Sequence, residues 1–362
     1  MKKTQVALAA LALVASTAAF ADGVKVSGQM DVGVGNTTGV GTYMEQGGWA
    51  DNSNITFSGE ETLGNGTKAF FTLASGFTQN GDPGNGGNGT LFSRESLVGL
   101  SGDFGTVKLG QQLSPYILSY AISQAGTPGM FWVNNFIMGG GLGNVAVGAG
   151  SGAFQKGGFF IPNAASYTTP SINGWTATVL SNTANGAKDG AMATTTSDPD
   201  KYMAVNVIGA VGPFNVTAGY QTRGNSYSSN VIGGSTSFGD LTIAGNYSSH
   251  KPDANSTNLM AGLNTGAYLL SAAYKLQEAL TLVGGYAAND IDVDQALTNI
   301  GLKYDMSKRT FAYVTYVRGV GGAQSSLAQR ARYFNGTTQQ VPALTGTTDN
   351  NNTTVVGIAH SF

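Results

Sequence analysis

The chain has 362 residues, of which 10% are charged, and 54 residues are glycine. Soluble proteins carry about 25% charged residues, and their glycine content is about half that of this chain. The composition therefore does not suit an ordinary soluble surface. The net charge of −2 offers no basic surface for nucleic acid, and the lack of cysteine excludes disulfides and thiolate metal sites.

The start of the chain has the layout of a cleaved secretory signal. Two lysines precede an apolar run over residues 6–14, and a small-residue cleavage site ends at Ala21. We therefore predict a signal peptide over residues 1–21 and a mature domain over residues 22–362. Beyond this segment no apolar run approaches the ~18 residues of a membrane-spanning helix. A membrane β-barrel and a secreted all-β protein remain.

Alternation of apolar and small polar residues separates these two classes. Residues 214–221 place four apolar side chains on one face and four small or polar residues on the other, and residues 241–248 follow the same pattern. A barrel strand in lipid needs about 9–11 residues with one apolar face, and its other face is polar only where the lumen is wet. A sandwich would instead make its inner faces apolar.

Sixteen such segments follow one another along the chain. They lie at residues 24–35, 54–63, 67–77, 93–101, 105–112, 164–170, 175–182, 202–211, 214–223, 230–238, 241–249, 266–276, 279–288, 296–306, 309–318 and 353–362. Their connections alternate between short turns and long loops rich in Asn, Gly, Ser and Thr, as in outer-membrane barrels. We predict an all-β fold, a 16-stranded antiparallel transmembrane β-barrel.

One connection differs from all others in length and chemistry. Residues 109–155 contain no charged side chain and no histidine, yet they carry eight aromatic or methionine residues. Connections of this length are either functional loops or disordered segments, and the aromatic residues argue for a packed loop. We expect this long third outer loop to fold into the barrel and to narrow the channel.

The chain ends on a strand whose apolar face includes its last residue. Val356, Ile358, His360 and Phe362 share one face of residues 353–362. A terminal aromatic residue on the lipid face suits a barrel that closes at the membrane interface, where aromatic girdles lie.

Several runs, in order along the whole chain, resemble the Gram-negative general porin family of the β-proteobacterial and neisserial type. These runs are residues 53–61, 93–102, 104–110 and 304–316, together with the terminal Phe362. The resemblance implies a diffusion channel for small hydrophilic solutes and ions in the bacterial outer membrane. It also implies a homotrimer in contact with outer-membrane lipid and lipopolysaccharide, with a third outer loop that folds inward.

The chain departs from the pattern of this family where the channel is expected to be narrowest. Asn54 and Ser58 stand where the family often has basic residues, Gln111 replaces a common arginine, and the long loop has no acid. In such channels, acids on the loop face bases on the wall, and the narrow opening focuses their field. We therefore expect a weak field and weak charge selectivity.

Three charged residues remain on the face expected to line the channel. Lys68, Glu95 and Lys108 are opposite in parity to apolar neighbours such as Phe71 and Val98, which are expected to face lipid. These charges could set a weak selectivity. Alternatively, Lys68 and Glu95 could simply pair with each other across neighbouring strands.

The long loop supplies the other candidates at the constriction. Phe131, Trp132 and Phe136 could anchor the loop against the wall, which we favour, or contact an apolar or sugar-like solute. Asn134 and Asn135 lie in the same run and are expected to border the channel.

Two other functions remain as alternatives. A surface barrel with a plugged pore could act mainly as an adhesin or a structural protein. An enzyme would need a nucleophile and a base, and His250 near Ser248 and Ser249 offers the best pair for a hydrolase. We predict that the chain is a channel and not an enzyme.

No cofactor or metal is predicted. The acidic residues at 290, 292 and 294 are similar to the start of a calcium loop. However, Gln295 occupies the position that requires glycine, and Gly301 occupies that of the bidentate glutamate. A solvated loop is the expectation, and weak calcium binding at the surface is the alternative.

Overall fold

The computed structural model describes residues 22–38, 41–45, 48–50, 53–77, 91–126, 160–182, 201–223, 227–252, 265–289, 295–320 and 351–362. The strands are β1 (Asp22–Thr37), β2 (Gly41–Glu45), β3 (Asn54–Gly64), β4 (Thr67–Gly76), β5 (Glu95–Gly102), β6 (Gly105–Leu113), β7 (Phe160–Thr168), β8 (Thr176–Asn182), β9 (Tyr202–Val211), β10 (Phe214–Arg223), β11 (Tyr227–Phe238), β12 (Leu241–Pro252), β13 (Thr265–Gln277), β14 (Leu280–Asn289), β15 (Gln295–Asp305), β16 (Thr310–Val320) and β17 (Asn351–Ser361). A helix, α2 (Pro115–Ile122), follows β6. Within these residues, no helix has the length and apolar character needed to cross a membrane.

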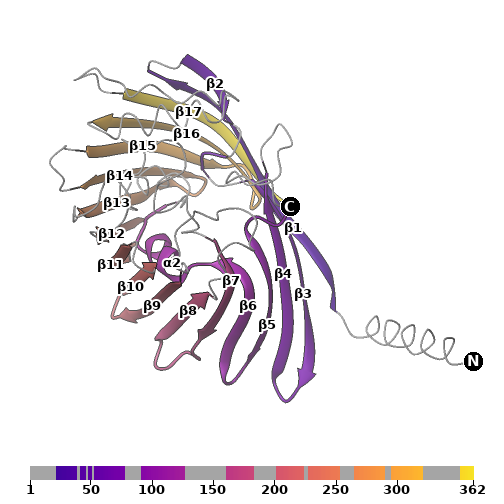
Figure 1. The fold of residues 1–362 in the computed structure, drawn as a ribbon. Helices are drawn as coiled ribbons and strands as arrows, with labels where there is room; N and C mark the ends of the chain where they lie inside the picture. The colour runs from indigo at the N-terminus through magenta and orange to yellow at the C-terminus, as the bar shows by residue number, and fades with distance from the viewer. Residues whose placement is uncertain are drawn as a thin grey trace, which may run out of the picture.

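The strands form one antiparallel sheet that closes on itself (Figure 1). From β3 to β17 each strand pairs with the next, and β17 pairs back with β1. On the other edge of β1, β2 pairs with residues 33–37 and β3 with residues 22–29, so β2 and β3 share one position. The barrel therefore has sixteen strand positions, and the prediction of a 16-stranded barrel is confirmed.

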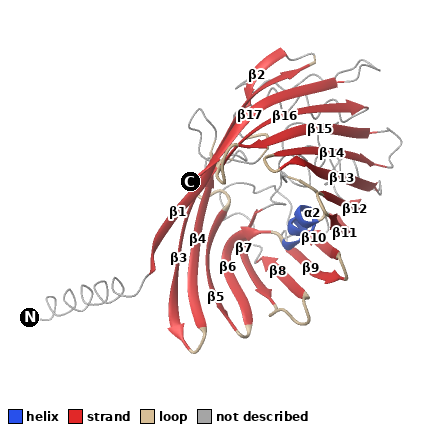
Figure 2. Cartoon of the chain, turned by 180° about the vertical axis from the view of Figure 1, so that it is seen from behind, coloured by secondary structure: helices blue, strands red, loops and turns tan. Residues whose placement is uncertain are grey.

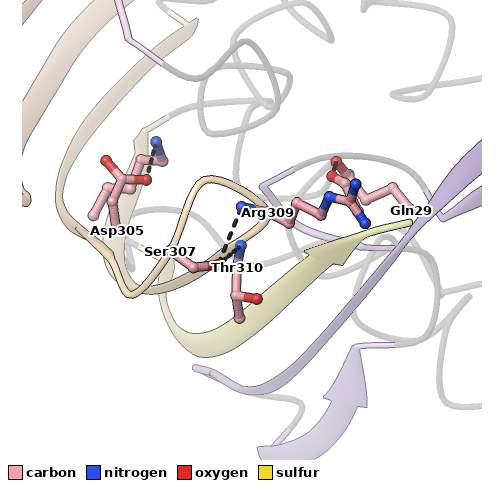
Figure 3. A network of polar contacts seen from close by, with 7 residues as sticks. Gln29, Asp305, Ser307, Arg309 and Thr310 are labelled. Atoms are coloured by element: carbon pink, nitrogen blue, oxygen red, sulfur yellow. Dashed lines mark hydrogen bonds and ion pairs between the residues drawn. The ribbon is translucent and has the colours of Figure 1, made fainter.

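Short turns join the strands at one end of the barrel. In the β3–β4 turn, Asn65 and Gly66 both have positive φ, at 49° and 73°, which two-residue hairpins of this kind require. In the β15–β16 turn, Ser307 Oγ accepts hydrogen bonds from the backbone N–H groups of Arg309 and Thr310 at 3.1 and 3.0 Å (Figure 3). These local contacts fix the register at the short-turn end.

Side chains alternate between the outside and the inside of the barrel as the sequence pattern predicts. In β5, Val98 is 55% exposed on the outer face while Leu97 is 6% exposed on the inner face. In β17, Val356 and Ile358 are exposed, whereas Val355 and Ala359 are buried. The outward apolar residues form the surface that lipid would cover.

The inner face is not uniform around the barrel. From β7 to β17 it carries two buried apolar clusters, one beneath α2 and one that includes Trp49 and Val355. Along β3 and β4 it carries partly exposed polar residues such as Thr56, Ser58 and Thr72. Figure 2 shows α2 on the concave side of the sheet. One side of the lumen is therefore covered by inward segments, and the other side is polar.

Candidate permeation pathway

Helix α2 is held to the inner wall by its first residues. Ser114 caps the helix by accepting a hydrogen bond from the backbone N–H of Tyr116 at 3.2 Å, and its hydroxyl lies 2.6 Å from that of Tyr202 in β9. Asn206, also in β9, donates through Nδ2 to the carbonyl of Pro115 at 2.9 Å. Proline suits the first helical position because the backbone nitrogen there needs no hydrogen-bond partner. The residues that begin α2 are therefore also the residues that attach it to β9.

Two tyrosines one turn apart form the buried face of α2. Tyr116 and Tyr120 lie 2.8 Å apart, hydroxyl to hydroxyl, and both belong to the apolar cluster that covers the inner wall. Burial raises the pKa of Tyr116 well above its ordinary value, with the neighbouring Tyr120 adding to the effect. Burial also raises the pKa of Tyr120, to about 12. Both side chains are therefore neutral at every physiological pH.

The chain after α2 continues along the inner wall. Asn246 in β12 donates through Nδ2 to Ser123 Oγ at 2.8 Å, and the backbone N–H of Ala125 donates to Ser271 Oγ in β13 at 2.9 Å. Small polar residues that face inward on these strands thus provide the attachment points. The segment from residue 114 to 126 lies on the wall, inside the barrel.

The rest of the expected constriction loop is outside the described residues. This part holds all five loop candidates, namely Phe131, Trp132, Asn134, Asn135 and Phe136. Their place at the constriction, and the inward course of the loop as a whole, stay predictions. The uncharged stretch also begins within a strand, because β6 extends to Leu113.

Lys68 lies on the inner face of β4, as parity predicts, but its partner differs from the one considered. Its Nζ lies 2.8 Å from Oε1 of Glu60 in β3, and both side chains are about half exposed, at 47% and 51%. Glu60 stands opposite Phe70, one step from Lys68 on the same face, a diagonal arrangement within reach of long side chains. Sequence reasoning missed this pair, although both residues belong to one hairpin.

The alternative in which Lys68 pairs with Glu95 is wrong. Lys68 stands opposite Ser101, whereas Glu95 stands opposite Ala74, six residues further along β4. At about 3.3 Å per residue this separates the two side chains by about 20 Å along the strand. Glu95 lies towards the end of the barrel that carries the long loops.

Lys108 also lies on the inner face, on β6. It stands opposite Gly99 in β5 and Ser166 in β7, and its side chain is partly buried. Arg94, just before β5, stacks over the ring of Phe160 at 5.2 Å from the ring centroid. This cation–π contact holds the guanidinium at the wall.

Comparison with known proteins identifies the family. A model described as Gram-negative porin matches residues 7–324. The chain belongs to this family. Over an alignment of 388 positions that covers all of both chains, it is 29% identical to the outer membrane porin protein 32 of Delftia acidovorans. It is 39% identical over 120 residues, 32% of this chain and 33% of the relative, to the major outer membrane protein P.IB of Neisseria gonorrhoeae.

Solved porin structures share the fold. The anion-selective porin from Comamonas acidovorans superposes with a TM-score of 0.70 at 22% identity, covering 94% of this chain and 99% of that one. OmpT of Vibrio cholerae in its trimer form gives 0.62 at 14% identity, with 94% and 99% covered. This porin is therefore an outer-membrane channel protein, and its short turns mark the periplasmic end.

The family and the fold are those of passive channels. The hydrolase alternative depends on His250. The side chain of this residue lies outside the described part of the structure. His360 lies on the outer face of β17 with its Nδ1 2.8 Å from Thr310 Oγ1. In the described residues no three metal-ligating side chains come together, and the acidic run at residues 290–294 lies outside them.

Proposed function

We propose that this porin is a passive diffusion channel for small hydrophilic solutes and ions, with weak charge selectivity. The observation that carries this proposal is the distribution of charge along the lumen. Residues 109–155 bring no charge to the expected constriction, and the inner face of α2 and of the chain up to residue 126 is neutral. Ions therefore meet little field where the channel is expected to be narrowest.

The inward-facing lysines of the described strands lie towards the periplasmic end. Five lysines face inward there, namely Lys25, Lys68, Lys108, Lys275 and Lys303. Two of them are compensated: Lys68 by Glu60 at 2.8 Å, and Lys303 by Asp305 at 2.7 Å (Figure 3). Charges on the turns face bulk water, where salt screens them.

Three of these lysines are not compensated, and Glu95 faces inward towards the opposite end of the barrel. Lys25, Lys108 and Lys275 have no ion-pair partner within the described chain. They lie towards the periplasmic end of the wall, and we expect them to favour anions only slightly. The anion selectivity stated for the Comamonas porin supports the same direction of preference.

Reversal potential in a salt gradient across a planar bilayer tests this proposal. The native porin should open in stable steps and show a small preference for anions. Replacing Lys25, Lys108 and Lys275 together by Gln should remove that preference, whereas Lys308→Gln, on a periplasmic turn, should not. A strongly selective native channel would refute weak selectivity, and a silent one would favour the adhesin or structural alternative with its plugged pore.

We also propose that this porin is a homotrimer surrounded by outer-membrane lipid and lipopolysaccharide. The trimer form of OmpT supports the trimer, and the exposed apolar residues on the outer face, such as Val98 and Val356, support a lipid environment. Native mass spectrometry of protein extracted in mild detergent should give the mass of three chains with bound glycolipid. A monomer under these conditions would contradict the proposal.

A further inference from the structure

Part of the inner wall of β14 to β17 is apolar, which is unexpected for a wet lumen. Val283, Leu297, Val317 and Val355 face inward from four consecutive strands, and each is at most 1% exposed. A porin that conducts through its lumen has a polar interior. Because apolar surface in contact with water is unfavourable, this stripe requires a cover.

A short segment between β2 and β3 provides part of that cover. Trp49 and Ala50 belong to the same buried cluster as the apolar stripe, at 1% and 0% exposure. The cluster also contains Ala125, which follows α2 on the wall. Residues 48–50, which come between β2 and β3 in the sequence, therefore lie against the inside of the wall.

Asp31 in β1 anchors this segment. Its Oδ2 accepts a hydrogen bond from the backbone N–H of Ala50 at 2.8 Å, and its Oδ1 accepts one from the hydroxyl of Tyr313 at 2.8 Å. Its own backbone N–H donates to Ser53 Oγ at 3.0 Å. Asp31 is fully buried, and a buried carboxylate is tolerated only with such partners.

We propose that residues 48–50, held in place by Asp31, form a second constriction element that limits the size of solute the channel admits. The inference rests on the proposed channel function. α2 and the chain up to Ala125 cover the wall from β7 to β13, and residues 48–50 extend this cover to β17. Solutes are thereby confined to the polar side of the lumen, along β1 and β3 to β6. Asp31 is a positioning residue, and Trp49 supplies the bulk.

The test compares pore size in variants of the full chain. Asp31→Ala removes both carboxylate acceptors, and Trp49→Ala removes the bulk but leaves the anchor, so a misfolded Asp31→Ala protein does not end the test. Asp31→Asn keeps one carbonyl acceptor and should behave between native and Asp31→Ala. Thr37→Ala is the matched control, because Thr37 is also buried in β1 and bonds to Thr353 at 2.8 Å, away from residues 48–50.

Two measurements are made on each variant: single-channel conductance, and the swelling of liposomes in neutral sugars of increasing size. Asp31→Ala and Trp49→Ala should raise the entry rate of the largest admitted sugar about twofold or more, since pore diameter governs passage. Thr37→Ala should leave it unchanged. Native pore size in both folded variants would overturn the inference.

The same experiment separates this inference from the proposed function. A silent native porin that begins to conduct after Asp31→Ala would overturn passive conduction but support the anchored segment as a block. Silence in native and variant proteins alike would overturn both. Conduction by the native porin with a larger pore in the variants supports both.

Discussion

Asp31 and Tyr313 are joined by a hydrogen bond across the strand that separates them. Asp31 lies in β1 and Tyr313 in β16, and β17 runs between the two. The row Tyr313, Gly357 and Gly33 is continuous across the three strands. The tyrosine side chain can lie flat over the two glycines and reach the carboxylate at 2.8 Å. This contact ties the first strand to the last ones at the closure of the barrel.

The glycine beneath Tyr313 should therefore be intolerant of a side chain. A Cβ at Gly357 would overlap the Tyr313 ring and hydroxyl, so Gly357→Ala should destabilise the barrel by about 1–3 kcal/mol through overpacking. Gly284→Ala is the control, because a Cβ there would have its nearest neighbour at 3.6 Å. Denaturant unfolding in lipid vesicles measures both, and equal midpoints would contradict this account of the seam.

The orientation of β10 and β12 predicts where arginine is tolerated. Ile243 is exposed on the outer face, and Ile243→Arg near the midplane should cost ~2–4 kcal/mol. Asn215 is exposed on the inner side, and Asn215→Arg should cost little. The free energy of unfolding in vesicles gives both values.

Thr217 lies on the same face of β10 as Asn215, so parity alone would predict that arginine is tolerated there too. Its surroundings predict otherwise. It is buried at 3% exposure, and a Cβ at the next inward residue, Gly219, would meet Ser119 Oγ of α2 at 2.9 Å. Thr217→Arg should therefore destabilise the protein by displacing α2. If Thr217→Arg proves as harmless as Asn215→Arg, α2 does not pack where the structure places it.

The end of the chain should matter for assembly. Phe362 exchanges two backbone hydrogen bonds with Gly28 in β1, both 3.0 Å long, and its ring lies where a side chain at Gly28 would be. Deleting Phe362 should slow the formation of folded barrel while leaving the formed barrel intact. The rate at which the heat-resistant form appears on gels measures this, with Ser361→Ala as the control. An unchanged rate would count against a role in closure.

The strand pattern was predictable because its period reports the face of each residue directly. All sixteen predicted segments coincide with strands of the barrel. β2 was not predicted, because its five residues share one barrel position with β3. The pairing of Lys68 with Glu95 was wrong for a different reason. Parity tells which face of the sheet a residue is on, but its position along the barrel axis depends on the register with neighbouring strands.

The inward segment at residues 48–50 was also missed, although a signal for it exists. Val283, Leu297 and Val355 have the parity of wet-face residues and are apolar. An apolar residue at a position expected to line water indicates that another part of the chain covers it. The identity of the covering segment, Trp49 and Ala50, follows from tertiary packing that no local pattern encodes.

The two buried tyrosines of α2 should make stability fall at high pH. Unfolded tyrosine ionises near pH 10, whereas burial raises the pKa of Tyr120 to about 12 and that of Tyr116 well above its ordinary value. Above pH 10 the unfolded chain therefore binds fewer protons than the folded one, so stability falls as pH rises towards 12 and is unaffected below pH 10. Unfolding midpoints at pH 7, 9 and 11 measure the effect. The double variant Tyr116→Phe, Tyr120→Phe should show a smaller fall, and an equal fall would assign it to other groups.

The last prediction concerns the part of the long loop that carries Asn134 and Asn135. If these residues border the conducting path, replacing both by Asp places two negative charges in an otherwise uncharged constriction, where a narrow opening focuses the field. The reversal potential in a salt gradient should shift towards cations. The native channel should be insensitive to pH between 3 and 8, because residues 109–155 contain no group that titrates there, whereas the Asp variant should lose its shift as pH falls below about 4.

The control for this experiment is Asn65→Asp, which adds a carboxylate on the exposed β3–β4 turn at the periplasmic end. Screening by salt should make that charge nearly silent at high ionic strength. A reversal potential that stays at the native value in the loop variant would place Asn134 and Asn135 outside the conducting path. A shift of equal size in the turn variant would mean that the potential reports charge at the mouth of the channel and not at its constriction.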